Sequence, residues 1–245
     1  MAFQSIIIIL SLCYLHICDA YIPLLHMRHS KNLRSNLRLY DGQVETPLED
    51  LFNILERAAE TKDVDGDICV SSLLDLEKTM RKMNKNDPNV MVKTLENLYG
   101  DWQLVFTTGT IDTQKKIGKI NYFPIKAVQS FTEDKYIQNT IWAFGAPLIK
   151  FSGEYQWLAS EKAGITKLTF DFDKLCLLEA LGGGFTINLK KGEAASLGAK
   201  SGLGSESNVD NAKKDKAAFF NWISANRNIA TARGGGGGLA LWKRI

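Results

Sequence analysis

The sequence predicts a mainly β protein, an antiparallel β-barrel preceded by a short helical segment. Apolar residues recur at helical spacing between residues 46 and 99, whereas from residue 100 onward they alternate with polar residues, as strands do. Roughly eight strands joined mostly by short, glycine-rich connections indicate a barrel or a sandwich, because both architectures manage exposed sheet edges. The long alternating segments favour the barrel, which has room inside for side chains or for one small ligand.

Residues 1–20 have the features of a secretory signal peptide. An apolar run from Ile6 to Ile17 is too short to span a bilayer. It ends at Cys18-Asp19-Ala20, and cleavage is expected after Ala20. No Lys or Arg precedes the run, which departs from the usual pattern.

Residues 21–40 form a basic leader. The leader contains four basic residues and no acidic one, a composition typical of transit peptides. A signal peptide followed by such a leader, with aromatic Tyr21 at the new N-terminus, resembles the two-part presequence of algae with secondary plastids. We therefore expect a plastid protein that is delivered through the secretory pathway. The alternative is a secreted protein with a basic arm.

Charge and composition exclude several function classes once residues 1–40 are removed. The remaining chain has 26 basic and 26 acidic residues, so it lacks the excess positive charge of a nucleic-acid-binding protein. All the histidines, His16, His26 and His29, lie within residues 1–40, which excludes Ser-His and Cys-His catalysis and imidazole metal sites in the remaining chain. Cys69 and Cys176 lack metal-site spacing, and they either pair with each other or remain buried thiols.

Three helices are expected between residues 46 and 99. The first begins at Thr46-Pro47-Leu48-Glu49, with a capping Thr, a Pro at the first helical position and a Glu three residues after the cap. The second is expected from about residue 72 to 83, and the third from Asp87-Pro88 to Gly100. The acidic stretch at 63–68 lacks both anchoring carboxylates of a calcium loop, which favours a solvated loop. We expect the helices to lie against the barrel as a plug or clasp.

The alternation of apolar and polar residues sets the expected strands. Strands are expected at about residues 101–107, 135–144, 149–157, 168–172, 185–189, 218–232 and 239–244. Turns are expected at residues 145–147, 161–164, 182–184 and 234–238. The polar stretch 191–216 has few large apolar residues, and we expect it to be a flexible insertion.

Three blocks of the sequence resemble the plastid lipid-associated proteins, also called fibrillins. The first is Leu98–Thr108, which is similar to the family's Gly-x-Trp-x-Leu opening strand. The second is Ile117–Phe131 followed by Ile137–Asn139. The third is Ala232–Arg244, with a closing Arg-Gly, a glycine turn and a final Arg. The resemblance covers about residues 46–245, and its specificity comes from the order and spacing of the blocks.

The resemblance implies a lipocalin-like barrel at residues 100–245, located in a plastid and associated with thylakoids or lipid droplets. The family is linked to the binding of carotenoids, quinones and other lipids, and it offers no catalytic motif. Asn226 and Asn228 depart from the family pattern, which is usually acidic there, and the stretch 191–216 is a further departure.

The candidate ligand-binding residues are the inward-facing members of the expected strands. Aromatic side chains there either form a close-packed core or line a site for a polyene, quinone or acyl chain, and both uses are expected within the set. The set is Trp102, Leu104, Phe106, Phe151, Tyr155, Trp157, Phe170 and Phe172. Asn139 and Arg233 are the candidate polar contacts, and Arg233 would bind either a ligand head group or a carboxylate at the rim.

We therefore expect a non-catalytic protein that carries a hydrophobic ligand (a carotenoid, a quinone or a lipid) at plastid membranes or lipid droplets. No cofactor and no metal are expected. The alternative is a structural or assembly protein of thylakoid membranes or photosystems with a filled barrel. A third hypothesis is an enzyme that acts on an apolar substrate through a Tyr or through carboxylates such as Asp171 and Asp173. A solvated outer face of the barrel explains these two carboxylates more simply.

Overall fold

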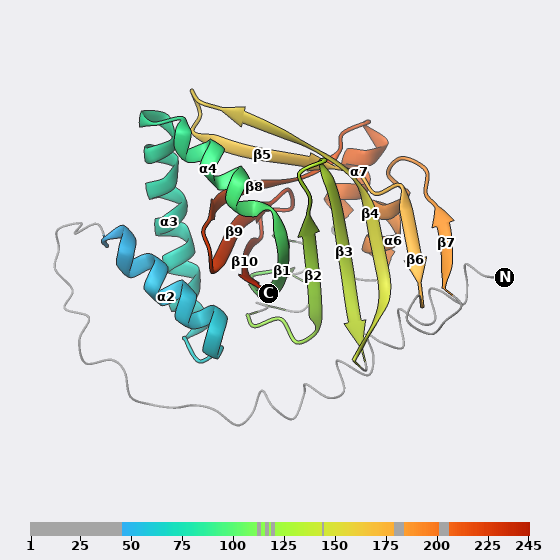
Figure 1. The fold of residues 1–245 in the computed structure, drawn as a ribbon, viewed down its shortest axis with the longest axis horizontal. Coiled ribbons are helices and arrows are strands. Elements are labelled where there is room, and N and C mark those ends of the chain that lie inside the picture. Colours follow the sequence, from blue (N-terminus) through green and yellow to red (C-terminus); the bar gives the residue numbers. More distant parts are fainter. Residues whose placement is uncertain are drawn as a thin grey trace. The chain divides into compact units, whose positions relative to one another are not determined.

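Helices precede strands in the computed structural model of the protein, as the sequence predicts (Figure 1). The structure describes residues 46–111, 114–115, 118, 121–143, 145–178, 184–200 and 206–245. The signal peptide expected at residues 1–20 and the leader expected at 21–40 lie outside the described residues, so both remain predictions.

The second helix begins earlier than its apolar stripe predicts. The three N-terminal helices are α2 (Leu48–Thr61), α3 (Gly66–Asn86) and α4 (Asn89–Leu98). Asp65 caps the first turn of α3, because its carboxylate accepts hydrogen bonds from the backbone N–H groups of Asp67 (2.9 Å) and Ile68 (3.3 Å). Part of the loop expected at residues 63–68 is therefore the start of a helix.

Eight antiparallel strands close into a barrel. Each barrel strand pairs with the next one along the chain, and the last pairs with the first. The strands are β1 (Gly100–Thr107), β2 (Lys126–Phe131), β3 (Tyr136–Ala143), β4 (Ala146–Ser160), β5 (Ile165–Phe170), β8 (Ala218–Ala225), β9 (Ile229–Gly234) and β10 (Leu239–Arg244). The predicted fold class, a barrel preceded by a helical segment, is confirmed.

The long strand β4 has two partners along one edge. Residues 155–160 pair with β5, whereas residues 149–152 pair with β6 (Lys174–Leu177). β6 in turn forms a hairpin with β7 (Phe185–Asn188). This hairpin lies outside the ring of eight strands, on the side away from α2 and α3 (Figure 1).

Three strand assignments differ from the sequence prediction. β2 and β6 were not expected, because neither has a long enough alternating pattern. The single strand expected at residues 218–232 is two strands, β8 and β9. Asn226 turns the chain between them, because its Oδ1 accepts hydrogen bonds from the backbone N–H groups of Asn228 and Ile229, both at 2.8 Å.

The stretch 191–216 is largely helical rather than a structureless loop. It contains α6 (Glu193–Lys200) and α7 (Glu206–Lys213), which contact each other. Of the turn expected at residues 182–184, only Gly184 lies within the described part of the chain.

Two apolar cores share the barrel wall. On the outside, the apolar faces of α2 and α3 pack against β8, β9 and β10 and form the outer core. On the inside, aromatic and small side chains of the strands form the inner core, which also receives Leu95 and Leu98 from α4. Two helices therefore pack against the outside of the barrel and one covers an end, an arrangement that the sequence left open. Among the described helices, none is long and apolar enough to cross a membrane.

Candidate ligand site inside the barrel

Strand pairing decides which side chains face the inside of the barrel. Trp102 pairs with Gln129, Gln129 with Asn139, and Asn139 with Phe151, so these four side chains share one face. That face is the inner one, because Trp102 belongs to the inner core. The inner core also contains the candidates Leu104, Tyr155, Trp157, Phe170 and Phe172.

The barrel end covered by α4 (the α4 end) is densely filled. The indoles of Trp102, Trp222 and Trp242 are buried there. Small side chains of β9 and β10 make room for them, namely Ala230, Ala232 and Ala240. Trp102 also donates its Nε1–H to the carbonyl of Leu98 at 2.7 Å, which ties the ring to the end of α4. Trp102 therefore serves as packed core rather than as an exposed lining.

Arg244 closes the α4 end from outside. Its guanidinium carbon lies 4.1 Å from the centre of the Trp102 ring, and its N–H groups donate to backbone carbonyls at the end of α4, just after it and in the β8–β9 turn. Burial lowers the pKa of this guanidinium from its ordinary value. Arg244 is thus already bonded to protein groups.

Tyr155 anchors β4 at the same end. Its ring is 3% exposed and lies edge-on to Phe131, with centroids 5.9 Å apart. Its hydroxyl donates to the carbonyl of Thr132 at 3.0 Å. Burial, with smaller contributions from Tyr99 and Asp134, raises the pKa of Tyr155 to about 12.

We expect the protein to lose stability between pH 10 and 12, and we expect Tyr155→Phe to lose less. A phenol with a pKa of about 12 in the native state titrates near pH 10 when unfolded, so its stabilising contribution is complete below pH 10. Across that window unfolding releases up to about one proton from this group, and the free energy of unfolding therefore falls as pH rises. Urea unfolding at pH 8, 10, 11 and 12 measures the slope. Equal slopes for wild type and Tyr155→Phe would rule out this assignment.

The opposite end of the barrel exposes its inward-facing side chains in part, and we call it the open end. There Leu104, Phe151, Phe170, Phe172 and Phe220 are half-buried, although they lie on or beside the inner face. Phe151, Phe172, Phe170 and Phe220 contact one another in sequence, with ring centroids 5.2 to 5.7 Å apart. Phe220 then contacts both Trp222 and Trp242, each at 5.8 Å. An unbroken aromatic chain thus leads from the open end into the buried core.

Phe106 does not face the inside, which corrects the prediction. The β1–β10 pairing shifts register between Leu104 and Phe106, because one extra residue, Val105, forms a bulge. The bulge turns Phe106 to the outer core, where its ring lies edge-on to Tyr122 with centroids 5.5 Å apart. The sequence alternates without interruption in this strand, so it gives no sign that the bulge moves Phe106 to the outer face.

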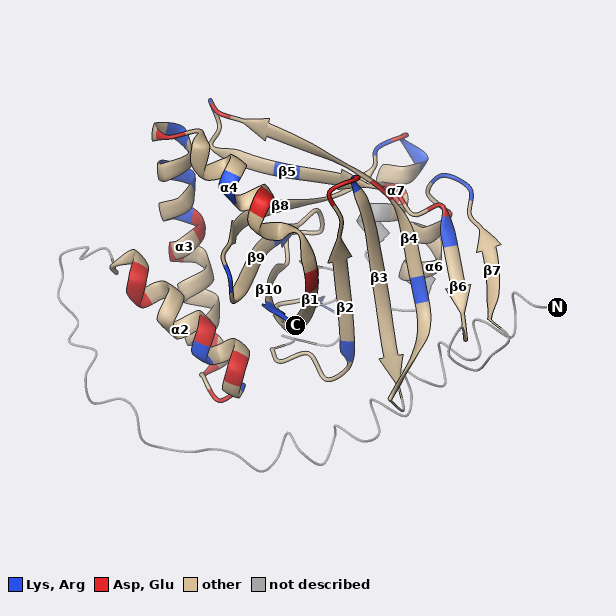
Figure 2. Ribbon diagram, in the orientation of Figure 1, with Lys and Arg blue, Asp and Glu red and all other residues tan. Residues whose placement is uncertain are grey.

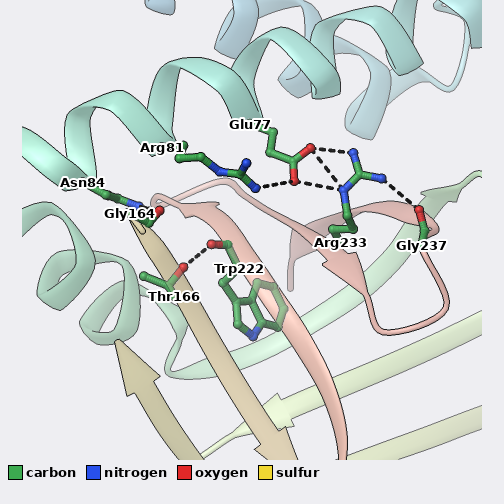
Figure 3. A network of polar contacts seen from close by, with 8 residues as sticks. All are labelled: Glu77, Arg81, Asn84, Gly164, Thr166, Trp222, Arg233 and Gly237. Atoms are coloured by element: carbon green, nitrogen blue, oxygen red, sulfur yellow. Dashed lines mark hydrogen bonds and ion pairs between the residues drawn. The ribbon is translucent and has the colours of Figure 1, made fainter. Parts of the chain in front are cut away.

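Arg233 also faces outward, so the predicted contact between Arg233 and a ligand inside the barrel is wrong. Its Nε donates to Glu77 Oε1 on α3 at 2.9 Å, and its Nη1 donates to the carbonyl of Gly237 at 2.9 Å (Figure 3). Arg81 lies beside the same carboxylate at 3.7 Å. Hydrogen bonding to Glu77 raises the pKa of Arg233. Of the two roles expected for Arg233, pairing with a carboxylate is the one that the structure shows.

Gln129 is the functional candidate that the sequence analysis missed. Its Nε2 donates to Asn139 Oδ1 at 2.8 Å, and the pair lies on the inner face. The available signal was its position two residues before Phe131, which places both side chains on one face of a strand. Phe220, Trp222 and Trp242 were missed too, and Leu239–Trp242 is apolar throughout, so its sequence does not show which face Trp242 occupies.

The remaining polar candidates lie apart from the inner face. Cys69 and Cys176 are free thiols, the first buried and the second partly exposed, and burial raises the pKa of Cys69. Asp171 accepts a hydrogen bond from the backbone N–H of Gly192 at 3.3 Å, at the end of β5. Within the described residues no group of His, Cys, Asp and Glu side chains is arranged to hold a metal ion.

A closed ring of eight antiparallel strands, each paired with its neighbour in the chain, defines a lipocalin-like, up-and-down barrel. No protein-family model and no curated protein matches the chain. Among solved structures, it is similar to a lipocalin-like protein from Bacteroides uniformis, with 11% identity over 61% of this chain and 99% of that chain and a TM-score of 0.34. It is also similar to an uncharacterized protein from Bacteroides eggerthii, with 13% identity over 60% of this chain and 99% of that chain and a TM-score of 0.36. Similarities this weak carry no conclusion, and the fold assignment rests on the strand pairing.

Proposed function

We propose that the protein is a non-catalytic carrier that binds an apolar small molecule through the open end of the barrel. The observation that carries this proposal is the aromatic chain from Phe151 to Trp242, whose members are half-buried at the open end and fully buried toward α4. Apolar side chains that remain partly exposed inside a barrel favour a ligand, because covering them removes apolar area from water at about 25 cal/mol per Å².

The finer part of the proposal is a carotenoid, quinone or lipid as cargo, carried at plastid membranes or lipid droplets. Its support is the resemblance of the three sequence blocks to fibrillins and the two-part leader. The flat rings of Phe170 and Phe220, stacked at 17°, offer a surface that suits a polyene or a quinone ring. Catalysis has no part in the proposal, because the inward-facing polar side chains are amides, indoles, a phenol and the guanidinium of Arg244, which is already bonded to backbone carbonyls.

Binding of N-phenyl-1-naphthylamine, an uncharged apolar fluorophore, tests the proposal. We expect saturable binding of one probe per chain, with energy transfer from the inner tryptophans to the probe. Ala127→Phe adds a ring at the open end, because Ala127 lies on the inner face of β2 and is partly exposed. This substitution should weaken binding about ten-fold or more, which corresponds to about 1.4 kcal/mol.

Leu158→Phe is the matched control, because Leu158 is 49% exposed on the outward face of β4. It should bind the probe as the wild type does. The proposal fails if the wild type shows no saturable binding, or if both variants bind equally well.

The second candidate is a structural or assembly protein with a filled barrel. The densely packed α4 end favours it, as does Phe185, which is 68% exposed on β7 at the edge of the extra hairpin. Absence of probe binding by the wild type, together with its comigration with a membrane complex, would support this role.

A further inference from the structure

Gln129 and Asn139 place two uncharged polar side chains inside an otherwise apolar barrel. They stand directly opposite each other across β2 and β3. The next inward-facing pair toward α4 is Phe131 and Ile137, and both are buried in the inner core. The amide pair therefore lies between the filled α4 end and the open end. Gln129 is only 5% exposed, while Asn139 is half-buried.

The amide pair leaves one buried hydrogen-bonding atom without a partner. Gln129 Nε2 is bonded to Asn139 Oδ1, but Gln129 Oε1 is buried and accepts no hydrogen bond from the described residues. Turning both amides over exchanges donor and acceptor and still leaves one Gln129 atom unbonded. Buried polar groups in native proteins are nearly always bonded, so a further group is expected at this position.

A second unpartnered atom belongs to another side chain of the inner core. Trp222 Nε1 has no hydrogen-bond acceptor among the described residues, and Trp222 is 2% exposed. The indole of Trp222 lies edge-on to Phe131, with centroids 5.4 Å apart, and Phe131 is two residues from Gln129 on the same face. An indole N–H donates only, whereas an amide oxygen accepts only. A hydroxyl group both donates and accepts, so it can bond to a buried acceptor or to a buried donor.

The charges of the barrel exclude a charged ligand group. Charged residues are sparse on the barrel strands (Figure 2), and strand pairing turns those on β2, β4, β5 and β9 outward. On the described barrel strands the inward-facing charge is Arg244, and its guanidinium is already bonded to backbone carbonyls at the α4 end. A carboxylate in this interior would lack a counter-charge, which makes its burial costly.

We propose that the Gln129–Asn139 pair binds the hydroxyl group of an uncharged apolar alcohol or phenol, which enters hydroxyl-first from the open end. This inference rests on the proposed function and specifies its ligand class. The aromatic chain covers the apolar body of the ligand, and Gln129 Oε1 accepts a hydrogen bond from the ligand hydroxyl. The inward-facing amides would thus select among ligands of equal length by their terminal group.

Displacement of N-phenyl-1-naphthylamine by 1-decanol, decane and decanoate tests the proposal. For the wild type we expect decanol to displace the probe about ten-fold better than decane or decanoate, which is the effect of one buried hydrogen bond. Gln129→Met keeps the length of the side chain and removes its polar atoms. It should bind decanol and decane equally, with each displacement referred to the variant's own affinity for the probe.

The outcomes separate this proposal from the proposed function. Absence of probe binding by the wild type overturns both. Probe binding with no preference for decanol, or with a preference for decanoate, overturns the hydroxyl assignment alone. The wild-type ligand series decides this even if Gln129→Met does not fold. A decanol preference that Gln129→Met retains also overturns the assignment.

Discussion

Replacement of Gly153 by alanine is expected to destabilise the protein by about 3 kcal/mol, the upper range for a buried overpacking substitution. A Cβ at this position would lie 2.0 Å from the carbonyl oxygen of Asp171 and 2.9 Å from Cα of Phe172. Both are backbone atoms, so no side-chain rotation relieves the clash. Hydrogen bonds from Asp171 N to Glu154 O and from Asp173 N to Ser152 O hold this backbone against β4. Relief would require the chain between β5 and β6 to move.

Urea unfolding followed by tryptophan fluorescence measures the loss. Gly234→Ala is the matched control, because a Cβ there meets Phe220 at 3.7 Å, an ordinary contact distance. The control should stay within about 0.5 kcal/mol of wild type. We also expect Gly153→Ala to bind the fluorescent probe more weakly, since it displaces Phe172 from Phe151 and Phe170. Similar stability losses in both variants would contradict the close approach at Gly153.

Removal of the Arg244 side chain is the second change with a large expected effect. Nε donates to the carbonyl of Arg227 at 2.9 Å, Nη1 to that of Tyr99 at 2.8 Å, and Nη2 to those of Asn97 and Asn226. The guanidinium therefore joins the end of α4 to the β8–β9 turn while covering Trp102. We expect Arg244→Met to cost about 3 kcal/mol, from lost charge-assisted hydrogen bonds and a lost cation–π contact.

Arg244→Lys should recover less than half of the lost free energy of unfolding. The planar guanidinium bonds to several carbonyls at once, and a single ammonium group cannot reach all of them. Lys243→Met is the control, since Lys243 faces outward and pairs with Glu60, which is largely exposed. It should cost no more than about 0.5 kcal/mol. Denaturant unfolding gives the free energies, and near-ultraviolet circular dichroism reports on the Trp102 environment. Full recovery of stability in Arg244→Lys would show that the positive charge alone stabilises the α4 end, without the planar geometry of the guanidinium.

Much of the fold could be predicted because its signals are local. The stripe of Leu51, Leu55 and Ala58 marks a helix face with no knowledge of what covers it, and all three side chains are buried. The alternation in β4 and β5 and the glycine turn before β10 likewise depend only on neighbouring residues. Short or irregular strands escape this kind of inference, as β2 and β6 do.

The candidate site could be predicted only in part, because two of its features depend on residues far apart in the chain. Arg233 meets Glu77 across 156 residues, and no local pattern indicates that α3 covers the outer face of β9. Gln129 becomes a candidate only when its amide is seen bonded to Asn139 with one atom unsatisfied. Neither residue type is rare, so composition carries no signal for either contact.

A helical segment followed by strands, the inward face of β4 and β5, and the absence of histidine beyond residue 40 all follow from the sequence alone. Periodicity and composition are sufficient to predict these features, because each depends only on residues that are neighbours in the chain. Strand pairing in the folded protein is needed to place Phe106 and Arg233 on the outside, to show which end is open and to turn Gln129 inward. A single-residue bulge reverses the face of every later side chain, and pairing across the ring selects the partners. Both depend on strand register, which is set when the barrel closes.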